Sequence, residues 1–213
     1  MSVDPLTQIF DKNHQHIEDA IPEIIQKRMT TITEIAFKAM LDMGINLDIS
    51  SQVSILYNFN DIVPDPRVNM KKGKITLQIP LLYLISSEDL KTPVYEWFKK
   101  QIEKKTDLTQ KDVLFINACF KFLENPKLSQ KAKKFVLYHE IAHISNGDIS
   151  SKPKSDQESK DRERKADMKA AEFSKAKEGA VYLFKIMSEF SVRNQKTHPS
   201  FLERIKYLEN CKF

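Results

Sequence analysis

Hydrophobic and polar residues follow a helical period along most of this chain. Between residues 21 and 43, apolar side chains recur every three or four positions, which is the spacing of one face of an α-helix. Gly44 follows this stretch and is suited to the left-handed conformation that ends many helices. The same spacing predicts further helices at 4–16, 93–103, 109–124 and 161–191.

Two shorter stretches, 50–59 and 75–79, instead alternate with period two, which predicts strands. The residues at 60–66 include two prolines, which cannot donate to a strand ladder, and they predict a loop. Only four of the 213 residues are glycine, which argues against a turn-rich β sandwich. The pattern therefore predicts a predominantly helical α+β fold with a small, partly antiparallel sheet.

The C-terminal half contains the remaining elements. Ser129 is the expected cap of a helix that ends at Gly147. The residues at 149–160 are almost wholly polar and predict an exposed, mobile loop. The helix at 161–191 is expected to bend at Gly179. A final helix is expected to start with Pro199 at its first position.

Charge and cysteine content indicate which partners and which compartment to expect. The net charge is +5, but the lysines are scattered among acids, which indicates a solvated surface and not a nucleic-acid site. Cys119 and Cys211 show no metal or redox spacing, so a reducing compartment is expected. Residues 1–20 lack the apolar core of a secretory signal, so none is expected, and no apolar run reaches about 20 residues. We therefore expect a cytoplasmic monomer, with signal-independent export left open.

The most informative motif is His139-Glu140-Ile-Ala-His143. On a helix, His139 and His143 lie on one face a turn apart and can bind one metal ion. Glu140 is offset by about 100° around the helix, beside that ion, where it can take a proton from a water molecule. The alternative is a buried helix that carries two structural histidines.

A catalytic zinc ion requires three protein ligands and an open position. Glu163 and Asp167 are spaced i, i+4 on the next predicted helix, beside alanines that would allow close helix packing. Glu163 is the expected third ligand, and Asp167 the acceptor that orients a ligand imidazole. The alternative is that the charged run at 160–165 is solvated surface.

Two residues near the C-terminus complete the candidate site. His198 could donate a hydrogen bond to an oxyanion, or could only cap the last helix. Arg204 could pair with Asp167, or form a surface ion pair of little energetic value.

Three blocks of sequence, 139–148, 163–171 and 197–205, together resemble the HtpX and CAAX-prenyl-protease family of gluzincin zinc metallopeptidases. The resemblance covers about residues 130–210. It implies that His139, His143 and Glu163 bind one zinc ion and that Glu140 is the general base.

The resemblance also implies that Asp167 supports a ligand, and that His198 and Arg204 lie near the transition state or its scaffold. More weakly, residues 73–82 resemble the edge strand with which an extended substrate pairs. The expected organisation is a zincin-like domain at 73–213, with its sheet over the motif helix, and N-terminal helices and a first strand at 1–72.

Members of the HtpX and CAAX types are membrane proteins, so this chain would be a soluble relative for which prenylated substrates are not expected. Two functions remain open. One is a zinc-dependent endopeptidase that hydrolyses polypeptides with a water molecule activated by Glu140. The other is a latent or inactive zinc-binding interaction module.

Overall fold

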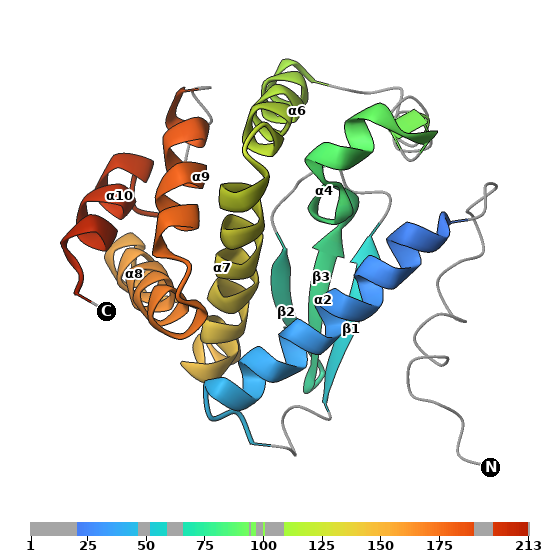
Figure 1. Cartoon of the computed structure of the whole chain (residues 1–213). Coiled ribbons are helices and arrows are strands. Elements are labelled where there is room, and N and C mark those ends of the chain that lie inside the picture. The colour runs from blue at the N-terminus through green and yellow to red at the C-terminus, as the bar shows by residue number, and fades with distance from the viewer. Residues whose placement is uncertain are drawn as a thin grey trace, which may run out of the picture.

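The computed structural model describes residues 21–46, 52–58, 66–93, 95–96, 100, 109–189 and 198–212 (Figure 1). The helix expected at 4–16 and most of the helix expected at 93–103 lie outside these residues. The described helices are α2 (Glu23–Asp42), α4 (Leu81–Leu84), α6 (Gln110–Leu123), α7 (Pro126–Ser145), α8 (Asp156–Ser174), α9 (Lys177–Glu189) and α10 (Phe201–Asn210). Two 3-10 turns, η1 (Ser87–Lys91) and η2 (Asp148–Ser150), accompany them.

The strands form one mixed sheet in the order β1-β3-β2. They are β1 (Val53–Asn58), β2 (Arg67–Lys71) and β3 (Lys74–Pro80). β1 runs parallel to β3, whereas β2 and β3 form an antiparallel hairpin. The predicted α+β fold, predominantly helical with a small and partly antiparallel sheet, is confirmed.

The resemblance of residues 73–82 to a substrate-binding edge strand implied the wrong position for their strand in the sheet. β3 is the central strand and pairs on both sides, so its backbone is not available to another chain. The edge strand beside it is β2, which the sequence did not predict because most of its five residues are polar and exposed. Lys72 and Gly73 join β2 to β3 with φ values of 51° and 76°, as a two-residue hairpin turn requires.

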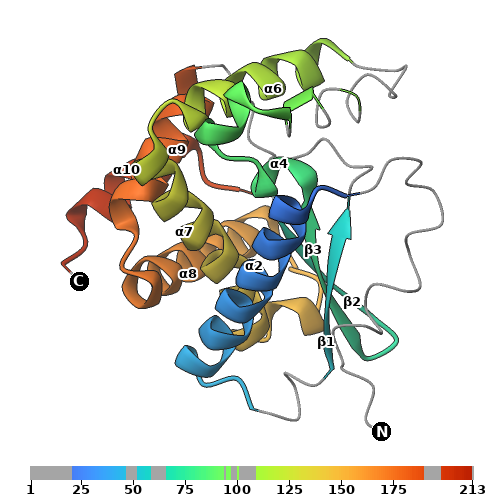
Figure 2. The same cartoon turned by 45° about the vertical axis from the view of Figure 1, so that its right-hand side comes forward.

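Helix α7 lies between the sheet side and the C-terminal helices (Figures 1 and 2). α2 crosses the sheet, where Thr33 hydrogen-bonds to Tyr57 of β1 over 2.9 Å. On its other side α7 packs against α8 and α9, and Phe135 is fully buried. The alternating residues Ile75, Leu77 and Ile79 of β3 belong to the same core. The motif helix is therefore fixed on several sides.

Two predicted helix starts are wrong because another residue satisfies the first free backbone N–H groups. α7 begins at Pro126, and Asn125 is its cap, since the Asn125 side chain accepts the N–H of Leu128 over 3.1 Å. Ser129 is instead buried inside the helix. α10 is capped by Ser200, so Pro199 precedes the helix.

The segment from 149 to 191 also differs from the prediction. Ser155 caps α8, so the second part of the polar stretch at 149–160 is helical. The long helix predicted at 161–191 is two helices, α8 and α9. The chain breaks at Lys175, which has a φ of 52°, and not by a bend at Gly179.

Gly179 instead lies where α9 closely approaches the backbone of α7. A Cβ atom at this position would lie 2.3 Å from the backbone nitrogen of Ala132. Gly179→Ala is therefore expected to lower the free energy of unfolding by about 1–3 kcal/mol, because α7 and α9 would have to separate. Chemical denaturation measures this change. The exposed Lys185→Ala on the same helix is the control, expected within about 0.5 kcal/mol of wild type, and equal values for the two variants would contradict the prediction.

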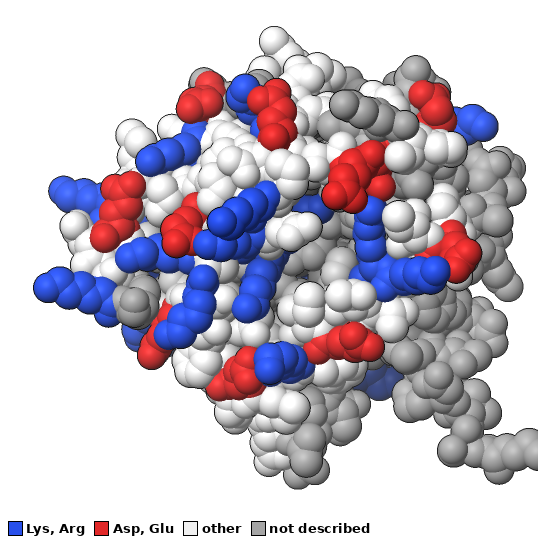
Figure 3. Space-filling model, viewed as in Figure 1, with Lys and Arg blue, Asp and Glu red and all other residues white. Residues whose placement is uncertain are grey.

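Basic and acidic side chains are intermixed on the face shown in Figure 3. Lys131 pairs with Glu178, and Lys185 lies 3.6 Å from Glu209. Within the described ranges, no helix is sufficiently long and apolar to span a membrane.

Candidate metal centre

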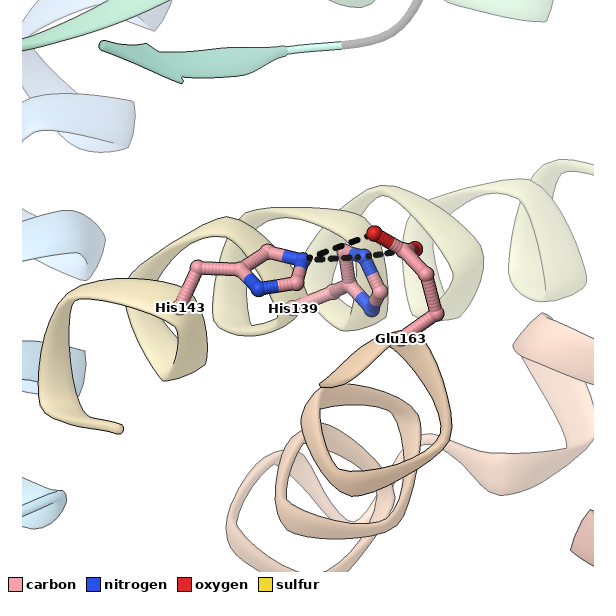
Figure 4. Close-up of side chains that lie close together, drawn as sticks. All are labelled: His139, His143 and Glu163. Atoms are coloured by element: carbon pink, nitrogen blue, oxygen red, sulfur yellow. Dashed lines mark hydrogen bonds and ion pairs between the residues drawn. The ribbon is translucent and has the colours of Figure 1, made fainter. Parts of the chain in front are cut away.

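The two histidines of α7 point to one side of the helix and toward α8 (Figure 4). Both are buried, and their Nε2 atoms lie 3.1 Å apart. This proximity follows from the i, i+4 spacing, which places His139 and His143 a single turn apart.

Glu163 reaches this pair from α8 (Figure 4). Its Oε2 lies 3.3 Å from Nε2 of His139, and its Oε1 lies 3.4 Å from Nε2 of His143. The approach is possible because α8 packs against α7 and presents Ala166 and Ala170, whose small side chains are fully buried.

The three side chains fit a tetrahedral metal ion. Ligands at about 2.0–2.1 Å from a tetrahedral zinc ion lie about 3.3–3.4 Å from one another. The two Nε2 atoms lie 3.1 Å apart, and the carboxylate offers Oε2 at 3.3 Å from that of His139 and Oε1 at 3.4 Å from that of His143. One ligand atom from each of the three residues lies within 4.8 Å of the others. In the described part of the chain, Oε2 of Glu163 is buried and accepts no hydrogen bond, although Nε2 of His198 also lies 3.3 Å away. Two imidazoles and a carboxylate are also a donor set that zinc binds well.

Each imidazole has a carboxylate at its other nitrogen. Oδ1 of Asp167 lies 2.9 Å from Nδ1 of His139, although not in line with a ring N–H. Oδ2 of Asp148 lies 2.9 Å from Nδ1 of His143. A carboxylate in this position favours the tautomer whose Nε2 lone pair is free for a metal.

Asp148 was not assigned a role from the sequence. It reaches back to His143 because Gly147 reverses the chain with a φ of 74°. Arg162 of α8 fixes the turn by donating to the backbone oxygens of Asp148, over 2.9 Å, and Ser151, over 2.7 Å. The sequence did offer a signal for this role, since Asp148 directly follows Gly147, the glycine expected to end the motif helix.

Asp167 is fully buried and is the centre of a polar network. Arg204 donates to both of its oxygens, over 2.8 and 2.5 Å. Tyr207 donates to Oδ2 as well. Tyr207 was missed by the sequence analysis, although its position three residues after Arg204 places both on one face of α10.

These contacts set the charges of the metal-free site. Burial disfavours the charge of Asp167, but Arg204 and His139 outweigh it and lower the pKa of Asp167 to about 2. Burial likewise opposes protonation of His139, yet Asp167 and Glu163 raise its pKa to about 10. For His143, Asp148 and Glu163 overcome burial and raise the pKa to about 9.

Glu140 lies beside the pair but points to the sheet edge. Its Oε2 accepts the backbone N–H of Val68 in β2 over 3.0 Å. Burial raises the pKa of Glu140, partly offset by His139 and His143. The contact with Val68 was not foreseen, because β2 itself was not predicted.

His198 lies two residues before Ser200, the cap of α10. Its side chain is 33% exposed, and burial lowers its pKa. The structure thus brings all seven predicted site residues to one region: His139, Glu140, His143, Glu163, Asp167, His198 and Arg204.

Residues 96–211 match the family model described as Peptidase U49. The chain belongs to the peptidase U49 family. The matched region is more than half of the chain and contains the whole candidate metal centre of this U49 peptidase. No curated protein and no solved structure matches the sequence.

Proposed function

We propose that this U49 peptidase is a zinc-dependent endopeptidase that binds one zinc ion per chain through His139, His143 and Glu163. The observation that carries the proposal is the set of separations of 3.1–3.4 Å among three buried donor groups. The resemblance to the HtpX and CAAX-prenyl-protease family supports the same ligand set.

A bound zinc ion would polarise the scissile carbonyl and lower the pKa of a water molecule. Glu140 would take a proton from that water and pass it to the leaving nitrogen. His198 would donate to the oxyanion that develops on the substrate, since it lies at the border of the site. Asp167 and Asp148 would hold the imidazoles in place.

The substrate is an extended polypeptide that would pair with β2 and not with β3, because β2 is the edge strand beside α7. Main-chain hydrogen bonds at such an edge bind a peptide without requiring one particular sequence.

Two measurements on the purified chain test this function. Metal analysis is expected to find about one zinc ion per chain, removable by chelation. A quenched-fluorescent peptide library is expected to show cleavage that chelation abolishes and zinc restores. Absence of any bound transition metal at neutral pH would overturn the proposal, whereas bound zinc without cleavage would favour the latent interaction module.

Zinc binding at pH 7 is expected to release roughly one to two protons. In the metal-free protein the two Nε2 atoms lie 3.1 Å apart, and the neighbouring carboxylates raise the pKa of His139 to about 10 and that of His143 to about 9, so both imidazoles favour the protonated form at pH 7. These protons must leave before both lone pairs can bind a metal, so affinity should rise with pH from 6 to 9. Calorimetry in buffers of different ionisation enthalpy measures the release. Zero release would contradict the prediction.

Asp148→Asn is expected to weaken zinc binding by about 10–100-fold, because the amide cannot hold the His143 tautomer as a carboxylate does. Competition with a chromophoric chelator gives the affinity independently of catalysis. Asp161→Asn changes an exposed acid of α8 and is the control, expected to bind as wild type. Equal affinities for the two variants would show that Asp148 does not support the site.

A further inference from the structure

The hairpin of β2 and β3 divides the backbone groups of β2 into two sets. In an antiparallel pair, opposed residues alternate between those that exchange hydrogen bonds and those that do not. The two-residue turn makes Lys71 and Lys74 a bonded pair, so Asn69 opposite Thr76 is also bonded. Val68 and Met70 therefore direct their N–H and C=O groups away from β3, toward the open edge.

The contact with Glu140 supports this assignment independently. The N–H of Val68 donates to Oε2 of Glu140 over 3.0 Å, and so cannot also bond to Leu77 opposite it. In the described ranges, the outward groups of Met70 have no hydrogen-bond partner. Val68 and Met70 thus differ, because the N–H of Val68 is already bonded to Glu140 and that of Met70 can still bond to another chain.

We infer that β2 divides its open edge between the base and the substrate: the N–H of Val68 positions Glu140, and the backbone of Met70 pairs with the substrate. This inference rests on the proposed endopeptidase function. Val68 is a positioning residue that acts through its backbone, because its N–H touches the carboxylate and not the peptide.

The physical reason is that a glutamate side chain has several rotatable bonds and must present one oxygen to the water. A hydrogen bond on Oε2 restricts the carboxylate and leaves Oε1 to accept the proton. Val68 lies between Arg67 and Asn69, whose backbone groups face β3 in the bonded pairs of the ladder, so the donor is placed by the sheet. Strand β2 therefore both pairs with the substrate and holds Glu140, so it aligns the base with the substrate.

Proline substitution separates the two roles, since it removes an N–H and is tolerated on an edge strand where that N–H faces outward. Val68→Pro is expected to lower kcat by about 10–100-fold, with KM within twofold of wild type. Met70→Pro, the matched control, is expected to raise KM and to leave kcat within twofold. The substrate for both is the most rapidly cleaved peptide of the quenched-fluorescent library, and zinc content should stay at one ion per chain.

If Val68→Pro does not fold, an amide-to-ester replacement at residue 68 removes the same N–H without a ring, and it should reproduce the loss of kcat. Equal effects of Val68 and Met70 variants on KM alone would overturn the inference, because both residues would then only bind substrate.

A second measurement does not depend on cleavage. In metal-free protein, Glu140→Ala is expected to shift the Val68 amide proton upfield by more than the Met70 amide proton, whereas Glu140→Gln retains an acceptor and should shift Val68 less. No Val68 shift on Glu140→Ala would overturn the inference even in an active enzyme. A shift in a protein that cleaves nothing would uphold the contact while the endopeptidase function fails.

Discussion

Glu140→Gln is expected to reduce peptide hydrolysis by about 10²–10⁴-fold and to leave zinc binding at one ion per chain. Glutamine has the same shape and can still accept the N–H of Val68, but it cannot take a proton from water. His139 and His143 remain unchanged on the neighbouring face of α7, so the proposed ligand set is intact. Initial rates on the library peptide and metal analysis of the same sample measure the two effects.

Glu172→Gln is the control, because Glu172 is an exposed glutamate of α8 away from the metal centre. It should retain wild-type rates and zinc content. A Glu140→Gln enzyme within tenfold of wild type would exclude Glu140 as the base, whereas simultaneous loss of zinc would show that the glutamate has a structural role in the site.

The core of the candidate site was predictable because its geometry is local. His139, Glu140 and His143 lie within five residues of one helix, and helical spacing alone fixes which of them share a face. Glu163 and Asp167 were predictable by the same argument once their helix was placed beside α7. Their small neighbours, such as Ala166, gave the signal that the two helices pack closely.

The rest of the site depends on contacts between segments far apart in the sequence. Alternation in 75–79 indicates a strand, but it cannot show whether that strand is central or at an edge, because this depends on its partners. β3 proved central, and β2 formed the edge. The contact of Val68 with Glu140 joins residues 72 positions apart and left no pattern in the sequence.

Helix starts were difficult for a different reason. Ser129 and Asn125 are both good caps, and only the structure shows which side chain accepts a free N–H. The same applies to Pro199 and Ser200 at α10. Such errors shift an element by a few residues without changing which face carries the site, so the ligand prediction was insensitive to them.

Arg204→Met is expected to lower the free energy of unfolding of the metal-free protein by about 3–5 kcal/mol, because it leaves the buried Asp167 carboxylate without its cation. Among the described residues, Asp167 would keep Tyr207 and His139 as partners. Its pKa should then rise from about 2, since burial would no longer be outweighed by the guanidinium. Chemical denaturation at neutral pH measures the loss.

The same substitution should also change how the free energy of unfolding depends on pH. In wild type the folded pKa of Asp167 is below its unfolded value of 3.8, so its stabilising contribution is present above that value and is lost as pH falls toward 2. In Arg204→Met the loss of folding stability between neutral pH and acid should be smaller than in wild type. Arg164→Met is the control, an exposed arginine 5.3 Å above the Tyr207 ring that should cost about 1 kcal/mol or less. If Arg204→Met cost no more than this control, α10 would not be anchored through Asp167, and the contacts that join Arg204 through Asp167 to the proposed ligand His139 would not stabilise the fold.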